Sequence, residues 1–351
     1  MKILIDINHP AHVHYFRNFI KLMEAKGHEF YVINRDSQMI NQLLDIYGIE
    51  HTIRNKRPKK KGTIFSIINL VRMTLWCIRK SLRFHPDMYI GFASSACAIT
   101  SWIFRKPCIL MDDTEHNAMN HHIYMPVCSA VLTPFYFYKD LQKGNKVKRN
   151  KQFRFNAYVE QLYLHSAFYK KNNQVLKELG VKPLEYVIVR YISYDAHHDL
   201  VVRPMPEESK KKIIMEIAKH FRVLLSLEKD DSDSFYDEYV LRISPQKMHD
   251  LEAHAKFMVT EGATMASESF VHGVPYLYIN PLKCGYIDYQ CEHYPERCFQ
   301  TTDREEALNI IRQLTMTNID SEAEKKKVEA LTINPTDFLM RFVDEYPSLT
   351  I

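Results

Sequence analysis

Short apolar segments alternate with amphipathic helical segments along most of this chain, and that alternation constrains the fold more than any other feature. In the first part, strand patterns at 2–7, 29–34 and 51–54 are separated by helical patterns at 12–26 and 38–47. A strand that pairs in parallel with its neighbour must return through a crossover, and the usual crossover is a helix. The pattern therefore predicts parallel sheets with helices on both faces.

The alternation continues to residue 314, with one interruption. Further strands are predicted at 87–92, 107–113, 129–134, 185–192, 222–227, 256–260 and 275–280, and further helices at 64–84, after Ser95, and at 172–179, 207–220, 246–254, 264–272 and 304–314. The interruption is the basic, polar stretch 145–156, which is typical of a domain boundary. The length of 351 residues also exceeds what one hydrophobic core usually serves. We predict an α/β protein of two doubly wound, Rossmann-like domains, 1–155 and 156–330. A polar tail, 331–351, is expected to pack back on the first domain.

The composition excludes several classes of protein. A hydrophobic fraction of 46% with 25% charged residues is that of a folded globular chain. The net charge of +5 suits acidic small molecules or an anionic membrane surface, and it does not require nucleic acid. Seven cysteines without a CxxC pair, no signal peptide and no long apolar run predict a cytoplasmic protein. Zinc at Cys284, Cys291, Cys298 and His293 stays an alternative, although known zinc sites use closer pairs.

Three histidines follow the first predicted strand. In doubly wound sheets, ligands bind outside the carboxyl ends of the strands, so His9, His12 and His14 lie where a site is expected. A lone histidine is more often structural, but a cluster favours function. A histidine at this place can accept a proton from a hydroxyl group near neutral pH.

A second polar group follows the strand predicted at 107–113. The segment "MDDTEHN" carries Asp112, Asp113, Glu115 and His116. These side chains fit acceptor binding or catalysis, and they fit plain helix capping equally well.

Two more segments stand at strand ends in the second half. Arg190 and Ser193, in "VRYISYD", suit an anion such as a diphosphate, although an exposed strand-end arginine is as good an interpretation. In "VTEGATMASES", Gly262 and Ala263 permit a close approach of the backbone, and a helix opens at Thr264 and Met265.

This glycine turn predicts a nucleotide pocket. Glu268 lies one turn inside the helix, where it can accept both hydroxyls of a ribose, and Gly273 ends the helix. The chain has no GxxxxGK[ST] and no GxGxxG after its first strand, which counts against a P-loop enzyme and a nicotinamide dehydrogenase.

These segments carry a resemblance to known families. The stretches "MKILIDINHPAHVHYF", "DDTEHN", "FNAYVEQLYLH", "VLKELG", "VIVR" and "EGATMASESFVHGVPYLYINP" resemble the DUF354 family over nearly the whole length. More distantly, 11–27 and 262–275 are similar to GT-B nucleotide-sugar enzymes. The likeness is to the transferase that adds N-acetylglucosamine to the lipid-linked peptidoglycan precursor, and to UDP-N-acetylglucosamine 2-epimerases.

The resemblance implies a role for each domain. A uridine nucleotide would be held by the second domain, with Glu268 on the ribose, and the acceptor by the first, with His12 on the family's loop histidine. The chain departs from the family at "NHPAH", where a glycine-rich loop is usual. It also departs at Ala263 and Ser267, where a glycine and an arginine are usual, and this puts the donor contacts in question.

Residues and resemblance together predict a metal-independent glycosyltransferase that takes a nucleotide-sugar, needs no cofactor and works in surface polysaccharide assembly. His12 would be the base, with Asp113 as its orienter or alternative. The basic run 54–62 and the helix after it predict peripheral contact with anionic membrane, which suits a glycan or lipid-linked acceptor. A 2-epimerase and a non-catalytic nucleotide-sugar-binding protein remain as alternatives.

Overall fold

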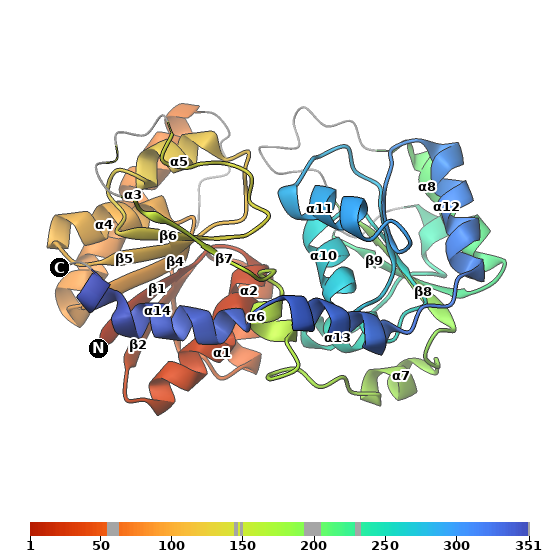
Figure 1. Ribbon diagram of the computed structural model, residues 1–351, viewed down its shortest axis with the longest axis horizontal. Helices are drawn as coiled ribbons and strands as arrows, with labels where there is room; N and C mark the ends of the chain where they lie inside the picture. The colour runs from red at the N-terminus through yellow and green to blue at the C-terminus, as the bar shows by residue number, and fades with distance from the viewer. Residues whose placement is uncertain (55–62, 144–146, 148–149, 193–204, 229–232, 350–351) are drawn as a thin grey trace. The chain divides into compact units, whose positions relative to one another are not determined.

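The chain folds into two compact units. The computed structural model describes residues 1–54, 63–143, 147, 150–192, 205–228 and 233–349 (Figure 1). Unit 1 comprises Met1–Tyr163 with Ile333–Ile351, and unit 2 comprises Leu164–Thr332. The division thus falls after Tyr163, beyond the boundary expected at 155. Strand Gln152–Phe155 completes the first sheet, and the buried side chains of Tyr158 and Leu162 follow it.

Unit 1 is built on one seven-stranded parallel sheet. The strands are β1 (Lys2–Ile7), β2 (Glu29–Asn34), β3 (His51–Ile53), β4 (Met88–Phe92), β5 (Cys108–Met111), β6 (Ala130–Pro134) and β7 (Gln152–Phe155). Their order is β3-β2-β1-β4-β5-β6-β7. β1 and β4 are almost wholly buried and apolar, as strands covered on both faces must be.

Helices cover both faces of this sheet. They are α1 (Pro10–Ala25), α2 (Gln38–Ile46), α3 (Thr63–Phe84), α4 (Ser95–Phe104), α5 (Ala118–Tyr124), α14 (Pro335–Leu349) and most of α6 (Gln161–Leu164). The C-terminal segment is therefore a helix and not a polar tail. Leu339, Phe342 and Val343 of α14 are buried, and α14 packs against α1 (Figure 1).

Unit 2 is built on a five-stranded parallel sheet of order β12-β11-β10-β8-β9. The strands are β8 (Tyr186–Tyr191), β9 (Arg222–Leu227), β10 (Met258–Thr260), β11 (Tyr276–Tyr278) and β12 (Cys298–Gln300). The helices are α7 (Gln174–Leu179), α8 (Glu207–Ala218), η2 (Ser234–Tyr236), η3 (Pro245–Lys247), α9 (Met248–Glu252), α10 (Ala263–Val271), α11 (Gly285–His293), α12 (Arg304–Met316) and α13 (Ser321–Leu331). The sequence pattern missed β12, α11 and α13.

Both sheets contain a topological switch point, which is where doubly wound folds place their ligands. In unit 1 the chain leaves β1 on one side toward β2 and later returns on the other side as β4. In unit 2 the same reversal occurs around β8, between β9 and β10. The loops after β1, β4, β8 and β10 are therefore the places to look for a site.

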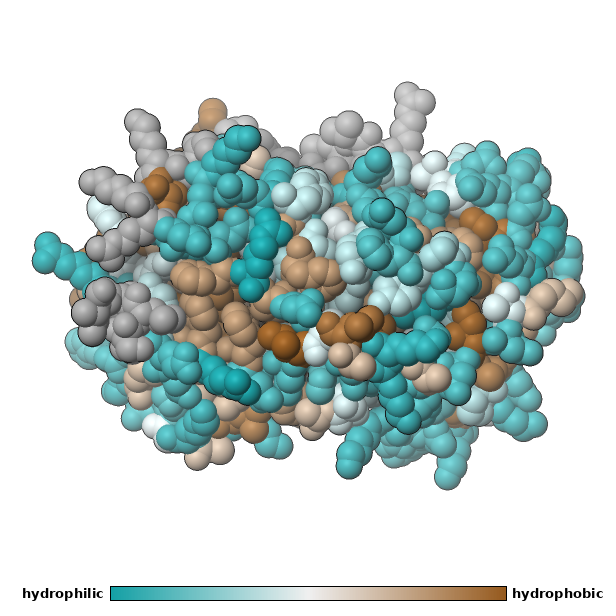
Figure 2. All heavy atoms as spheres, viewed as in Figure 1, coloured by the Kyte–Doolittle hydropathy of each residue, from teal (hydrophilic) through white to brown (hydrophobic). Residues whose placement is uncertain are grey.

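The surface gives two further facts about the chain. Figure 2 shows a mostly hydrophilic surface on the face in view, interrupted by hydrophobic patches. Within the described ranges, no helix combines the length and the apolar character needed to cross a bilayer.

Candidate functional site

The loop after β1 runs straight into α1, and its own residues occupy the start of that helix. His9 is the N-cap residue, and its ring nitrogen Nδ1 accepts the N–H of Ala11 at 3.3 Å. Pro10 has no N–H to offer, and the N–H of His12 is bound by the carbonyl of His9 at 3.0 Å. The first amides of α1 are therefore occupied or missing, so this helix end offers little to an anion.

His12 lies at the predicted edge, but its geometry changes its role. Its Nδ1 accepts the backbone N–H of Asn8 at 3.3 Å, so the proton of the neutral ring is on Nε2. Burial, with His9 nearby, holds the pKa of His12 well below its usual value. The ring packs against Phe92 and Tyr15, with centroids 4.8 and 5.9 Å away. His12 is thus a neutral hydrogen-bond donor and not the ready base that the sequence suggested.

His14 does not join this edge. It is buried against Tyr47 and Tyr163, and its Nδ1 lies 3.4 Å from both Arg17 and the Tyr47 hydroxyl. Residues 12 and 14 point to different sides of a helix, because two residues correspond to about 200° of rotation. The structure therefore separates His14 from His9 and His12, with which it was grouped in the sequence.

Sequence reasoning missed a buried polar network beside His12. Asp6, the penultimate residue of β1, accepts hydrogen bonds from Ser94 and Asn8 and pairs with Nη1 of Arg54 at 3.2 Å. Arg54 also donates to the side chain of Asn8. The network ties the ends of β1, β3 and β4 together, and only the fold brings residues so far apart in sequence into contact.

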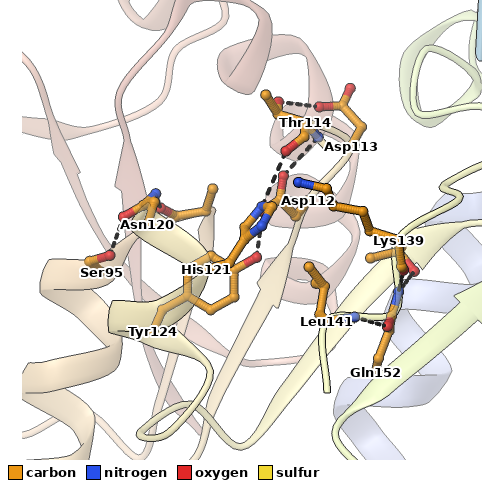
Figure 3. A network of polar contacts seen from close by, with 12 residues as sticks. Ser95, Asp112, Asp113, Thr114, Asn120, His121, Tyr124, Lys139, Leu141 and Gln152 are labelled. Carbon is orange, nitrogen blue, oxygen red and sulfur yellow. Dashed lines mark hydrogen bonds and ion pairs between the residues drawn. The ribbon is translucent and has the colours of Figure 1, made fainter. Parts of the chain in front are cut away.

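Figure 3 shows why the two aspartates after β5 have different roles. Asp112 is fully buried and accepts the Thr114 N–H at 2.9 Å and the Tyr124 hydroxyl, while Nε2 of His121 lies 3.3 Å away. Its oxygens are engaged inside the protein, so Asp112 organises the loop and is not available to a ligand.

Asp113 points away from that network, and its carboxylate accepts a hydrogen bond from the Thr114 hydroxyl at 3.0 Å (Figure 3). Burial, with Asp112 and Glu115 nearby, raises the pKa of Asp113 to about 7. Tyr136 lies within electrostatic range of Asp113, Glu160 and Tyr15. A carboxyl group that titrates near neutral pH is suited to proton transfer.

The remaining predicted residues of unit 1 frame this corner. Glu115 is fully buried and His116 is exposed on the same loop. In the described part of the chain, His12 and Asp113 share no hydrogen bond, so Asp113 does not orient His12. The backbone of Asn8 does that instead.

The start of α10 in unit 2 is open, unlike that of α1. The first helical bond runs from the Ala266 N–H to the Gly262 carbonyl. Among the described residues, the N–H groups of Ala263, Thr264 and Met265 have no acceptor. Three free amides at the positive end of a helix dipole form an anion-binding arrangement.

The two glycines that bracket this segment differ in whether the structure requires a glycine at that position. At Gly262, φ is −95°, and an added Cβ would make only ordinary contacts, at 3.5 Å from Thr260 and 3.7 Å from Ile192. At Gly273, φ is +77°, and a Cβ would lie 2.0 Å from the carbonyl oxygen of Ser321. Packing against α13 therefore requires Gly273, whereas neither the φ of Gly262 nor its protein neighbours require a glycine there.

Arg190 stands at the end of β8, opposite Thr260 and Ser226 in the neighbouring strands. Its Nη1 donates to Ser226 at 2.8 Å. Burial lowers the pKa of Arg190, while Glu228, Glu268 and Glu252 act in the opposite direction. Ser193, predicted to act with it, lies outside the described residues.

Glu252, at the end of α9, is a buried carboxyl group that the sequence did not reveal. It is fully buried, and neither of its oxygens has a hydrogen-bond partner in the described part of the chain. Burial and the charge of Glu268 raise the pKa of Glu252 well above its usual value, against the effect of Arg190. A buried carboxyl group without a partner is costly, so it points to a ligand group as its partner.

Glu268 occupies the predicted place one turn into α10, and His249 fixes its position. Nε2 of His249 lies 3.2 Å from Oε1 of Glu268, and both side chains are buried. This contact engages one of the two oxygens that the sequence assigned to a ribose. His249 comes from α9, and nothing in the local sequence marked it.

Two other kinds of site were considered. Among the described residues, no group of three or more His, Cys, Asp and Glu side chains is placed to hold a metal ion, the cysteines around 291 included. A cavity of about 1080 Å³ exists in unit 1, lined by Met1, Met88, Pro107 and Ser129, among others. These residues lie at the amino ends of strands, so the cavity is at the opposite edge of the sheet.

Comparison with known proteins gives the family and the fold. The chain belongs to the DUF354 family, described as proteins of unknown function, whose pattern matches residues 1–347. An uncharacterised protein of Methanocaldococcus jannaschii is 24% identical over 364 residues, covering 99% of this chain and 98% of the relative.

Solved structures share the fold over nearly the whole chain. A UDP-N-acetylglucosamine 2-epimerase from Rickettsia bellii matches with a TM-score of 0.68 and 11% identity, covering 99% of this chain and 96% of its own. The M. jannaschii UDP-GlcNAc 2-epimerase, solved with UDP-GlcNAc and UDP, matches with a TM-score of 0.64 and 13% identity, covering 94% of this chain and 99% of its own. The glycotransferase of kitacinnamycin matches with a TM-score of 0.63 and 13% identity, covering 97% of this chain and 98% of its own. The fold is thus of the GT-B type, as predicted.

Proposed function

We propose that this protein is a glycosyltransferase that takes a UDP-sugar donor and transfers the sugar to a hydroxyl group of a glycan or lipid-linked acceptor. The observation that carries the proposal is the open start of α10, with its three free amides at the switch point of unit 2. This arrangement suits the diphosphate of a nucleotide-sugar. The match to structures solved with UDP or UDP-GlcNAc supports the choice of nucleotide.

The leaving diphosphate needs positive groups, and unit 2 has them. Arg190 and the amides of Ala263, Thr264 and Met265 stabilise the charge that develops as the glycosidic bond breaks. Glu268, oriented by His249, accepts a ribose hydroxyl. Because these groups do the work often given to a divalent cation, we expect a reaction that needs no metal and no cofactor.

The acceptor hydroxyl must lose a proton, and Asp113 in unit 1 is the base we assign to this step. Its pKa of about 7 leaves it substantially ionised at neutral pH, yet basic enough to take a proton. His12, with its proton on Nε2, donates a hydrogen bond that positions the acceptor. The sequence had suggested His12 as the base, with Asp113 as its orienter or alternative, so this assignment exchanges their roles.

The cell location is part of the same proposal. All seven cysteines are free, and six of them are buried. Free thiols suit a reducing compartment, which supports a cytoplasmic enzyme that builds surface polysaccharide from activated sugars.

A 2-epimerase is the second candidate, and one observation favours it. Asp113 and Glu160 lie within electrostatic range of Tyr136, and Glu115 lies within electrostatic range of Asp113. An epimerase needs several acid–base groups around the sugar, whereas a transferase needs a single base. The 2-epimerase structures cover most of the chain, although at 13% identity or less the likeness shows the fold alone.

One experiment separates the candidates. The purified full chain is incubated with a panel of UDP-sugars, first without an acceptor and then with an acceptor library, and the products are followed by NMR. We expect no new sugar nucleotide without an acceptor, transfer with the right acceptor, and no loss of transfer in EDTA. The Asp113→Asn variant should bind donor but transfer the sugar about 10²- to 10⁴-fold more slowly. An epimeric UDP-sugar formed without an acceptor would establish the epimerase, and donor binding without any turnover would indicate a binding protein.

A further inference from the structure

The helix α3 of unit 1 has its amphipathic character reversed relative to an ordinary surface helix. Its most buried residues are Thr74, Cys77 and Ser81, with at most 8% exposure. Its exposed face carries large aliphatic side chains, each 45–71% exposed: Ile64, Ile67, Ile68, Val71, Leu75 and Leu82. Surface helices normally turn polar residues outward, so an aliphatic outer face indicates a partner.

These six residues, the aliphatic stripe, lie on one side of the helix. Their spacing of three, one, three, four and seven residues keeps all of them within about 100° of the helix circumference. The stripe is therefore continuous and extends along most of the length of α3.

The charges beside the stripe have one sign. Helix α3 contains Arg72, Arg79, Lys80 and Arg83 and no acidic residue. The three arginines are exposed, on one flank of the stripe, and none forms an ion pair within the described residues. Lys80 lies over the Trp76 ring, with its amine 5.1 Å from the centroid.

The neighbouring helix continues this character. Helix α4 packs against α3, and its last turn exposes Trp102 by 63% and Ile103 by 47%. Arg105 and Lys106 follow directly, and both are exposed. Tryptophan beside cations is the composition that favours the interface between water and lipid.

We propose that the aliphatic stripe of α3 docks on the surface of an anionic phospholipid bilayer. The stripe enters the boundary between head groups and acyl chains, and the arginines beside it meet lipid phosphates. A second copy of the chain fits less well, because two α3 faces would bring eight cations together with no acidic partner on either helix. Docking stands on this surface alone and does not depend on the proposed function.

The test is binding of the purified full chain to vesicles, measured by flotation. We expect binding to phosphatidylcholine vesicles that contain phosphatidylglycerol, none to pure phosphatidylcholine, and release by salt. Each cation near the surface is worth about fivefold in partitioning, so Arg72→Gln, Arg79→Gln and Arg83→Gln together should weaken binding about 100-fold. Val71→Ser with Leu75→Ser should weaken it at least about 10-fold and leave the melting temperature unchanged.

The control removes two aliphatic side chains of similar exposure elsewhere. Met316 and Leu331 of unit 2 are 80% and 66% exposed, and changing both to Ser should leave vesicle binding intact. Three results would overturn the proposal. The first is that the wild-type chain does not bind anionic vesicles. The second is that the control variant loses as much vesicle binding as Val71→Ser with Leu75→Ser. The third is that light scattering shows a dimer, which Val71→Ser with Leu75→Ser dissociates.

Discussion

Two helices that begin beside the switch points of their units differ in their first turns. Helix α1 follows β1 and helix α10 follows β10, each at a strand beside its unit's switch point. The start of α1 is closed by Pro10 and by the bonds of His9, whereas the start of α10 leaves three amides without an acceptor. A helix end binds an anion only where its amides are free. On the proposed function, we therefore expect the diphosphate at the start of α10 in unit 2 and the proton transfer in unit 1.

The largest effect is expected from removing the proposed base, Asp113 in unit 1. Asp113→Asn should lower turnover by about 10²- to 10⁴-fold, the usual range for a positioned general base, with little change in affinity for UDP. Steady-state kinetics and calorimetry on the same preparation give both quantities. In the wild type, turnover should rise with pH through about 7 as Asp113 ionises. A parallel loss of UDP binding in the variant would place Asp113 in the nucleotide site and end the division of roles.

The next effect tests the open helix start directly. Ala263→Pro removes one free amide at the first position of α10, where proline is well tolerated. A hydrogen bond to a charged group contributes about 1.5–3 kcal/mol, so affinity for UDP should fall about 10- to 100-fold while the melting temperature holds.

Pro10→Ala at the corresponding position of α1 is the matched control. It adds an amide to a helix start that His9 closes, and UDP affinity should not change. Equal effects of the two substitutions on UDP affinity would remove the distinction between the helices.

A smaller effect is expected at the ribose. Glu268→Gln should weaken UDP binding about 10-fold, because a charged acceptor is lost. The same substitution should matter less for 2′-deoxy-UDP, which lacks one of the hydroxyls that Glu268 would accept. Calorimetry measures the affinity of the wild type and of the variant for both nucleotides. An equal loss for both ligands would mean that Glu268 only holds His249 in place.

The smallest effect concerns stability. Asp113 has a folded pKa of about 7 and an unfolded value near 4, so the folded protein holds an extra proton between these pH values. Stability linked to this group is therefore lost as pH rises from about 4 to about 7. Thermal melts should show Asp113→Asn equal to the wild type at pH 4 and more stable at pH 8. A constant difference at both pH values would mean that the pKa is not raised.

Much of the fold follows from the sequence, because central parallel strands are buried runs bounded by helical patterns. β1 and β2 were predicted to the residue, and β4 to within one. β7 was missed because "QFRF" is an edge strand beside a basic stretch, and edge strands carry polar residues. Helix α14 was mistaken for a tail, although its buried Leu339, Phe342 and Val343 have helical spacing.

The site was predictable only where it is local. The start of α10 and Glu268 follow one another in sequence, so the segment showed both. Glu252 and His249 reach Glu268 from another helix, and Arg54 reaches Asp6 from another strand, so only the fold joins them. Chemistry at His12 also escaped the sequence, because a single backbone bond from Asn8 decides which nitrogen carries the proton.

The most direct measurement of the central claim is a titration of isotope-labelled protein with UDP, followed by the backbone amide signals in NMR. The account predicts large downfield shifts for Ala263, Thr264 and Met265, which would gain a phosphate acceptor, and little change for Ala11 and His12 at the start of α1. Shifts confined to the start of α1, or none at the start of α10 under saturating UDP, would contradict it.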